Sequence, residues 1–351
     1  YGAQIQQIGR MAAEGDVVPE AAGSDRAVEI ATRYADRVLQ DWDGGDRALK
    51  VVWDPGNGSA GPIVKALAAR LPGHHMVINA DVDGRFPNHH PDPSKPENLA
   101  DVIRALKETD AEIGIAFDGD GDRLGVVTKD GEIIYPDRQL MLFAADVLSR
   151  VPGGQIIYDV KCTRLLAPWI RQHGGEPLMW NTGHALVKAK LKETGAPLAG
   201  EMSGHIFFKE RWYGFDDGLY TGARLLEILS RSADVNAPLK ALPNSPSTPE
   251  LNIKMAEGEP FALIDKLKAE GFFGAERIHS EVAVNKITGE VTQIGGSPPP
   301  VISIKLPSSA HSQPGSTVVT QLQILTIHSF CQSLLGSFPE EAGLVPGFKP
   351  I

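Results

Sequence analysis

The first part of the fold is decided by the stretch Ile113-Gly114-Ile115-Ala116-Phe117-Asp118-Gly119-Asp120-Gly121-Asp122-Arg123-Leu124-Gly125-Val126-Val127. An apolar run precedes an acidic segment that contains two glycines, and a second apolar run follows it. Short apolar runs that are bounded by turn residues are typical of buried β-strands. The stretch therefore predicts two buried strands, joined by a tip that carries three aspartates and an arginine.

The tip has the composition of a site for a metal ion and a phosphate group. Asp118, Asp120 and Asp122 alternate with glycines, so a bent loop can turn all three carboxylates toward one point. Mg²⁺ takes oxygen ligands of this kind. The guanidinium of Arg123 is a permanently charged fork that suits phosphate. We therefore predict a Mg²⁺ site on the three aspartates, next to a phosphate-handling arginine.

Other interpretations of the acidic tip fit the sequence less well. A calcium-binding EF-hand loop needs glycine at its sixth position and glutamate at its twelfth, where this chain has Arg123 and Lys129. A P-loop phosphotransferase would need its characteristic lysine, and no Asp-x-Asp-x-[Thr/Val] nucleophile loop is found. A solvated acidic turn is the structural alternative.

Strand-like and helix-like segments alternate along the chain on both sides of this tip. Such alternation predicts an α/β fold: two tandem similar α/β domains with mixed, largely parallel sheets, plus a divergent C-terminal segment. Sites in such sheets gather at the carboxyl ends of the strands. The strands are expected at 49–53, 75–79, 112–117, 124–128, 133–135, 155–160 and 177–181. The helices are expected at 62–71, 97–109, 184–193 and 217–231, and after caps at Ser24, Asp137 and Thr163.

Six motifs, in this order, resemble those of the α-D-phosphohexomutases, in particular the bacterial phosphomannomutase/phosphoglucomutase group. The resemblance extends from about Ile5 to about Ala256. The motifs are Asp54-Pro55-Gly56-Asn57-Gly58, Phe86-Pro87-Asn88-His89-His90-Pro91-Asp92-Pro93, Asp118 to Arg123, Asp159-Val160-Lys161-Cys162-Thr163-Arg164, Thr182-Gly183-His184 and Gly200-Glu201-Met202-Ser203-Gly204-His205.

The resemblance implies a reversible transfer of phosphate between O1 and O6 of mannose or glucose, through a phosphorylated serine and a bisphosphate intermediate. It also implies roles for individual residues. Mg²⁺ would be bound by Asp118, Asp120 and Asp122. The implied catalytic residues are Arg123, Lys161, His184 and His205. The implied substrate-binding residues are Thr182, Gly183, Glu201 and Ser203.

The residue types agree with these roles, although each has a structural alternative. Lys161 follows an apolar strand, where an ammonium group can bind phosphate or carry a proton, or can simply be solvated. His184 opens a helix after a glycine, and a helix N-terminus favours an anion. Glu201, Ser203 and His205 put a carboxylate, a hydroxyl and an imidazole on one short loop, the mixture that sugar hydroxyls require.

Three further segments are not assigned catalytic roles. Residues 86–93 are predicted to be a packed loop that shapes the metal side, because adjacent histidines diverge and no cysteine accompanies them as in a zinc site. Residues 54–59 lack the Gly-Lys-[Ser/Thr] ending of a nucleotide loop and are predicted to be a structural turn. Arg211, Trp212 and Asp216-Asp217-Gly218 are expected on the sugar side.

Two loops that are typical of the family are not found in this sequence, and this shapes the predicted domain organisation. Neither a Thr-Ala-Ser-His-type serine loop nor an Arg-x-Ser-Asn-type phosphate loop is found. We therefore expect weak or no mutase activity from this chain, with a non-catalytic module that binds Mg²⁺ and sugar phosphate as the alternative. The predicted parts are 1–25 (the end of an N-terminal domain and a linker), 26–132 (metal loop), 133–244 (sugar loop), 245–280 (the start of a C-terminal domain) and 281–351 (a divergent tail).

Composition narrows the classes of partner. The net charge of −10 disfavours nucleic acid and anionic membranes. No apolar run reaches the length of a membrane span. The two cysteines, Cys162 and Cys331, lie far apart and favour a reducing, cytoplasmic environment. A hexose phosphate is the expected partner, and the sequence identifies no protein partner.

Overall fold

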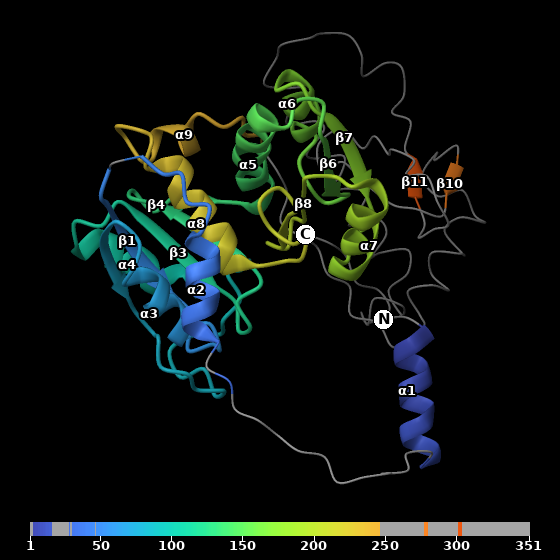
Figure 1. Cartoon of the computed structure of the whole chain (residues 1–351), viewed down its shortest axis with the longest axis horizontal. Helices are drawn as coiled ribbons and strands as arrows, with labels where there is room; N and C mark the ends of the chain where they lie inside the picture. Colours follow the sequence, from blue (N-terminus) through green and yellow to red (C-terminus); the bar gives the residue numbers. More distant parts are fainter. Residues whose placement is uncertain are drawn as a thin grey trace, which may run out of the picture.

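Two β-sheets organise the chain, and Figure 1 shows them side by side. The computed structural model describes residues 3–15, 28, 30–45 and 47–245, and the backbone of two short strands at 277–279 and 301–303. Each of the two large sheets combines parallel strands with antiparallel strands at one edge. The predicted fold class, two α/β domains with mixed, largely parallel sheets, is confirmed.

The first sheet contains β1 (Leu49–Asp54), β2 (Gly73–Val77), β3 (Ile113–Phe117), β4 (Leu124–Thr128) and β5 (Ile133–Ile134). Their order across the sheet is β2-β1-β3-β4-β5. β1 is parallel to β2 and β3, whereas β3–β4 and β4–β5 are antiparallel. Every residue of β3 and β4 is buried, as expected for strands that are covered on both faces.

The second sheet contains β6 (Gln155–Asp159), β7 (Glu176–Trp180), β8 (Leu198–Gly200) and β9 (Ile206–Phe208). Their order is β7-β6-β8-β9, with the first three parallel and β9 antiparallel to β8. The first four strands of the first sheet have the same order and the same directions. The β3–β4 loop and the β8–β9 loop therefore occupy equivalent places in the two domains.

The helices cover both faces of each sheet. α4 contacts β1 and β3 on one face of the first sheet, and α3 contacts β2, with α2 beside it. α7 contacts β6 and β8, whereas α6 contacts β7 and α5 contacts β8. The bounds are α1 (Ala3–Glu14), α2 (Ala31–Leu39), α3 (Gly61–Ala68), η1 (Pro96–Leu99), α4 (Ala100–Glu108), α5 (Pro136–Arg150), α6 (Leu166–Gln172), α7 (His184–Thr194), α8 (Gly218–Leu229) and α9 (Ala237–Lys240).

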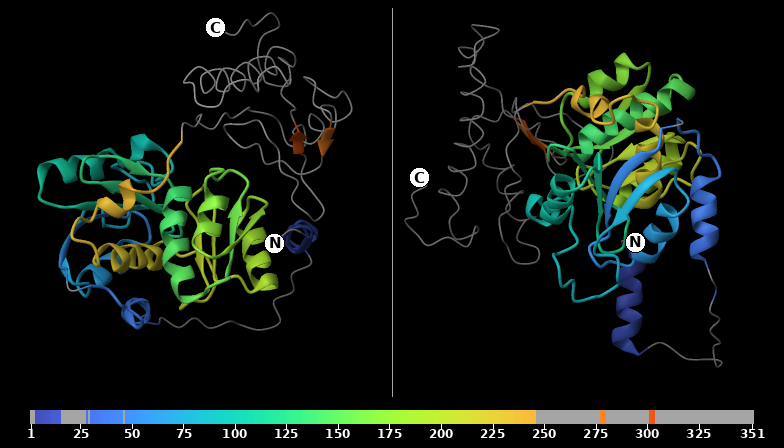
Figure 2. Two further views of the ribbon diagram at one scale, coloured as in Figure 1. Left: turned by 90° about the horizontal axis from the view of Figure 1, so that it is seen from above. Right: turned by 90° about the vertical axis from the view of Figure 1, so that its left-hand side faces the viewer.

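Helix α8 connects the two domains. It contacts β3 and β4 of the first sheet and β9 of the second, and Figure 2 shows it at the junction together with α5. Gly222 of α8 lies close to Trp53, since an added Cβ would be 3.3 Å from the indole ring. One continuous apolar core therefore includes residues from both sheets and from α8.

Apolar side chains on successive strand residues point to opposite faces of each sheet, so helices must cover both faces. Val51 and Trp53 of β1 belong to the core shared with α8, while Val52 between them packs on the α4 side. Ile206 and Phe208 of β9 likewise face that shared core, and Phe207 faces α7. Successive side chains of a strand point to opposite faces, so these runs are apolar on both sides.

Two predicted helix caps are wrong. The residue before α5 is Tyr135, and Asp137 lies in the first turn, where its carboxylate accepts from the N–H groups of Arg138 and Thr163. α6 begins at Leu166 rather than directly after Thr163, because residues 160–165 form turns first. The short strands β8 and β9, and helix α9, were not predicted. Three-residue strands leave little periodicity to detect.

Several sequence predictions lie outside the described residues. They include the Ser24 cap, most of residues 245–280 and most of the tail after 281. Within those stretches the structure describes β10 (Arg277–His279) and β11 (Val301–Ser303), which pair antiparallel. The domain limits remain predictions. No helix in the described part of the chain is both long enough and apolar enough to cross a membrane.

Candidate active site

The β3–β4 loop, residues 118–123, is called the metal loop below. Asp118 directly follows β3 and is buried. Its Oδ1 accepts hydrogen bonds from the backbone N–H groups of Gly121 and Arg123, each at 3.1 Å. Its Oδ2 accepts from Arg123 Nε at 2.6 Å. These bonds bend the loop back on itself, which a glycine at φ +81° in position 121 permits.

The three aspartates of this loop converge. Asp118, Asp120 and Asp122 each offer an oxygen within 4.8 Å of the other two. Burial, with the neighbouring charges of Asp118 and Asp120, raises the pKa of Asp122 to about 7, against the influence of His205. Asp122 Oδ1 is buried and has no hydrogen-bond partner among the described residues. An oxygen-only donor set in which one buried oxygen accepts no hydrogen bond fits a hard divalent cation such as Mg²⁺.

Arg123 is clamped by two carboxylates. Its Nε donates to Asp118, and its Nη1 lies 3.2 Å from Asp92 Oδ1. Asp92 in turn accepts from Ser94 Oγ at 2.7 Å. A guanidinium that is fixed in this way presents its remaining donors in one direction, which suits a phosphate group.

The β8–β9 loop, residues 201–205, is called the sugar loop. It meets the metal loop through an antiparallel β-bridge between Arg123 and His205. Leu124 N donates to Gly204 O at 3.4 Å. Gly218, the first residue of α8, donates its N–H to Gly121 O at 3.0 Å. The backbone itself therefore places the equivalent loops of the two domains against each other.

Two predicted catalytic histidines lie together beside this bridge. The rings of His184 and His205 stack with centroids 5.3 Å apart. His205 Nδ1 is 3.2 Å from Asp216 Oδ2 and 3.4 Å from Asp122 Oδ1. Burial alone would lower the pKa of His205, but Asp216 and the charges of Asp122 and Glu201 raise it overall. His205 thus stands between the metal loop and the second domain.

Asp216 lies between the two histidines and a lysine. Its Oδ2 is 3.1 Å from His184 Nδ1, and its Oδ1 accepts from Lys188 Nζ at 2.7 Å. The pKa of Asp216 is lowered well below its usual value: burial opposes this, but the contact with His205 and the hydrogen bond from Lys188 prevail. One buried carboxylate thus orients both histidines.

The sugar loop carries a buried carboxylate. Glu201 Oε1 accepts from the N–H of Gly183, and Ser203 Oγ lies 3.5 Å from Glu201 Oε2. Burial raises the pKa of Glu201, although the Gly183 hydrogen bond lowers it. Gly183, at φ +132°, precedes α7, so this bond links the sugar loop to the segment that carries His184.

Asp159 connects the remaining predicted residues. It is fully buried at the end of β6. Its Oδ2 accepts from Thr182 Oγ1 at 2.8 Å, and its Oδ1 accepts from Met202 N at 3.1 Å. Lys161 is exposed in the turn that follows β6, at the same edge of the sheet. Asp159 therefore anchors both segments of the second domain that the sequence predicts to bind substrate.

Sequence reasoning did not select Asp92, Asp159 and Lys188 as functional residues, and it named Asp216 only as part of a segment on the sugar side. A signal existed for Asp159, which ends an apolar strand at the edge where sites gather. None existed for Lys188 or for the role of Asp216, because their partners come from other elements. Long-range pairs of this kind require the fold.

The comparisons with known proteins agree with this arrangement. "Phosphoglucomutase/phosphomannomutase, alpha/beta/alpha domain II" matches residues 32–131, and domain III of the same family matches residues 135–245. These two matches cover more than half of the chain. The chain has two α/β domains of the phosphosugar mutase type, and it belongs to the phosphoglucomutase/phosphomannomutase family. The resemblance stated from the sequence is confirmed.

Similar proteins include bacterial enzymes of both names. A phosphoglucomutase of Neisseria meningitidis is 62% identical over 66% of this chain and 51% of its own length. A phosphomannomutase/phosphoglucomutase of Pseudomonas aeruginosa is 52% identical over 78% of this chain and 59% of its own length. A crystal structure of a family protein from Burkholderia thailandensis has a TM-score of 0.73 and 61% identity, covering 79% of this chain and 59% of that one. The chain thus spans between half and three fifths of the length of these relatives.

Proposed function

We propose that this chain supplies the metal site and the sugar site of a phosphohexomutase that interconverts hexose 1-phosphate and hexose 6-phosphate, with mannose or glucose as the sugar. The Arg123–His205 bridge is the observation that carries the proposal. It joins a loop suited to Mg²⁺ and phosphate to a loop suited to sugar hydroxyls. A phosphate ester needs both kinds of group at one place.

The residues have distinct tasks in this proposal. Asp118, Asp120 and Asp122 hold the cation, which when bound neutralises charge on a phosphoserine and on the transferring phosphoryl group. Arg123 donates hydrogen bonds to the equatorial oxygens of that group. Because both of its carboxylate partners are fixed, it needs little reorganisation during transfer.

Transfer also requires a base. As the bond between phosphorus and the serine oxygen breaks, a sugar hydroxyl forms the new bond to phosphorus and gives up its proton. His205 and Lys161 are the two candidates for accepting that proton. Glu201 and Ser203, with Gly183 and Thr182, present acceptors and donors for the other hydroxyls, and His184 lies next to His205 for the phosphate.

A non-catalytic binding module is the second candidate. Such a module would bind Mg²⁺ and a hexose phosphate without transfer. Both candidates share every residue of the metal loop and the sugar loop, so binding alone does not separate them.

Binding of hexose phosphate tests what the candidates share. Phosphorus NMR titrations would follow glucose 1-phosphate and mannose 1-phosphate with the chain in the presence of Mg²⁺. Ser203→Ala removes one hydroxyl partner and should weaken binding about 3- to 10-fold. Ser232→Ala, which lies outside both loops, is the matched control. Equal affinity in all three proteins would contradict the sugar loop assignment.

Turnover separates the two candidates. The serine-bearing domain of a full-length family member would be fused to this chain, and formation of the 6-phosphate would be measured for both 1-phosphates. A mutase predicts turnover by the fusion that requires Mg²⁺, with little or none from the chain alone. A fusion that binds the sugar phosphates but does not convert them would favour the binding module.

A further inference from the structure

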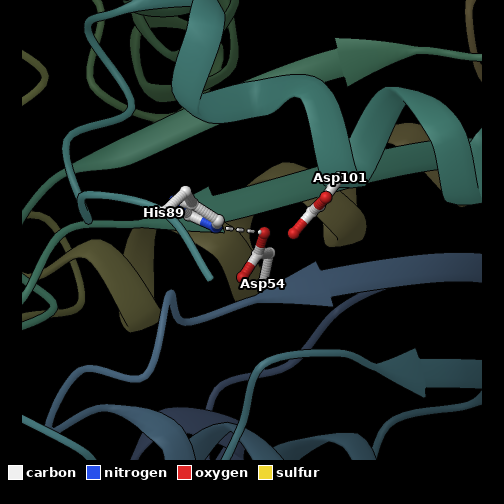
Figure 3. A group of neighbouring side chains, drawn as sticks. All are labelled: Asp54, His89 and Asp101. Carbon is white, nitrogen blue, oxygen red and sulfur yellow. Dashed lines mark hydrogen bonds and ion pairs between the residues drawn. The ribbon is translucent and has the colours of Figure 1, made fainter. Parts of the chain in front are cut away.

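A buried ion pair lies behind the metal loop, outside the residues assigned above. Figure 3 shows Asp54 at the end of β1, His89 in the loop of residues 86–93, and Asp101 in the first turn of α4. Asp54 is fully buried. Its Oδ2 is 2.9 Å from His89 Nε2, while its Oδ1 accepts from Gly56 N at 2.8 Å and from Asn79 Nδ2 at 3.2 Å.

Both ring nitrogens of His89 face acceptors. Nε2 faces the Asp54 carboxylate, and Nδ1 lies 3.0 Å from the carbonyl oxygen of His90. A carbonyl accepts only, so Nδ1 carries a proton, and the buried carboxylate requires one on Nε2. The ring is therefore an imidazolium. The hydrogen bond to Asp54 raises the pKa of His89 to about 9, in agreement with this geometry.

This protonation argues against a metal site at the same place. The side chains of Asp54, His89 and Asp101 are close enough to share an ion. An imidazolium has no lone pair for a metal, and Asp101 already accepts from Asn79 and Arg104. The group is satisfied as an ion pair with a second carboxylate nearby, so its role is to hold the chain in place.

The backbone around the pair is strained. Among the described residues, four non-glycine residues have positive φ, and three of them lie here: Asn57, Asn79 and Phe86. Hydrogen bonds join the segments that contain these residues. Asn57 N donates to Asn79 O at 2.7 Å, and Asn88 Nδ2 donates to Asn57 Oδ1 at 2.8 Å. Such conformations cost free energy and persist where surrounding contacts enforce them, which is common near functional sites.

The strained segments reach the metal loop. Ser59 N donates to Gly119 O at 2.9 Å. Pro91 and Phe86 pack on Gly119, since an added Cβ there would be 3.4 Å from the former and 3.6 Å from the latter. Asp92, the next residue after Pro91, contacts Arg123. The loop that His89 ties to β1 thus touches the metal loop in two places.

We propose that the His89–Asp54 ion pair is a positioning device, which fixes residues 86–92 so that Asp92 and Pro91 hold Arg123 and Gly119 in the geometry that binds the cation. In the described part of the chain, no hydrogen bond or ion pair joins His89 or Asp54 to the three aspartates of the metal loop. His89 and Asp54 act through Pro91 and Asp92, and are positioning residues. The positioning stands on geometry, whereas its consequence for phosphoryl transfer rests on the proposed function.

The experiment compares His89→Gln with His74→Gln, an exposed histidine near the opposite end of the first sheet. Amide hydrogen exchange is measured in the metal-free chain. The proposal predicts that His89→Gln speeds amide exchange in residues 86–92 and 118–123 only. His74→Gln should leave the exchange rates of these residues unchanged. Exchange that rises uniformly over the first domain would indicate a merely structural role and would overturn the proposal, as would unchanged exchange.

Two further readouts keep the test decisive. Nitrogen NMR of the unaltered chain at pH 7.5 should show protons on both ring nitrogens of His89, and a single unprotonated nitrogen would contradict the assignment. Calorimetric Mg²⁺ titration should show about 3- to 10-fold weaker binding in His89→Gln than in the control. If the unaltered chain binds no Mg²⁺, the proposed function fails, while exchange and NMR still decide the positioning role.

Discussion

Arg123 and His205 belong to different domains, yet a backbone β-bridge pairs them. The relative position of a guanidinium and an imidazole is therefore set by main-chain contacts and not by flexible side chains. The same junction includes the hydrogen bond from Gly218 N to Gly121 O. Main-chain pairing is the more rigid way to keep two loops in register.

The junction should be sensitive at Gly204. This glycine has φ +109°, and an added Cβ would lie 3.2 Å from Arg123 Cβ. Gly204→Ala should lower the free energy of unfolding by about 1–3 kcal/mol. Gly84→Ala, where nothing lies within 4 Å, should change it by less than about 0.5 kcal/mol. Urea unfolding of both variants measures the difference, and equal stabilities would show that the junction tolerates a side chain.

Asp120 should matter for the cation and not for folding. It is the exposed member of the three aspartates, so Asp120→Asn replaces a charged ligand oxygen by a neutral one and relieves repulsion without opening a cavity. We expect Mg²⁺ affinity to fall at least about 10-fold, equivalent to about 1.4 kcal/mol, while stability stays within about 0.5 kcal/mol. Asp110→Asn, at the opposite end of β3, is the control. Calorimetry and thermal unfolding give the two readouts.

Asp159 should couple the sugar loop to Thr182. In the unaltered chain, Thr182 Oγ1 and Met202 N each donate to a different oxygen of Asp159. Asp159→Asn leaves only one acceptor oxygen for these two donors, and should cost about 1–3 kcal/mol of stability. Thr182→Val removes one donor and should cost less. The double variant should cost less than the sum, with a coupling of about 0.5–1.5 kcal/mol. Strict additivity would mean that the two side chains do not interact in solution.

Stability should fall as pH rises through the titration of His89. Its folded pKa of about 9 exceeds the unfolded value of 6.5. A raised folded pKa contributes stability that is complete below the unfolded value and is lost as pH rises to the folded one. We expect the titration of His89 to contribute a loss of about 2 kcal/mol between pH 6.5 and 9, by the conversion of 1.36 kcal/mol per pKa unit with an allowance for partial exposure.

The same titration has a matched control. His89→Gln should be less stable at pH 6.5 and should show a flatter profile up to pH 9. His74→Gln should keep the slope of the unaltered chain. A profile for His89→Gln that is parallel to the unaltered one would show that another group titrates.

Much of this site was predictable because its residues sit in local patterns. The aspartates of the metal loop, the strands on either side and the helix that begins at His184 all follow from residues a few positions apart. The strands expected at 124–128 and 133–135 are found as β4 and β5. Short-range periodicity and turn chemistry are what a single sequence reports.

The remainder depended on distant contacts. Residues 86–93 and 54–59 were predicted to be a packed loop and a structural turn, but the sequence did not show that His89 would meet Asp54, 35 positions away. The role of Asp216 likewise depends on the α7 residues His184 and Lys188. α8 was predicted as a helix, but not as the element that joins both sheets. Such pairings depend on tertiary packing, which local propensity does not report.

The central claim is that one acidic loop binds a divalent cation next to a bound sugar phosphate. Calorimetry can measure the affinity for glucose 1-phosphate with and without Mg²⁺, and the affinity for Mg²⁺ with and without the sugar phosphate. We predict that each strengthens the other by the same factor, at least about 5-fold, and that Asp120→Asn abolishes this coupling. A chain that does not bind Mg²⁺, or an Asp120→Asn variant that titrates like the unaltered protein, would contradict the claim.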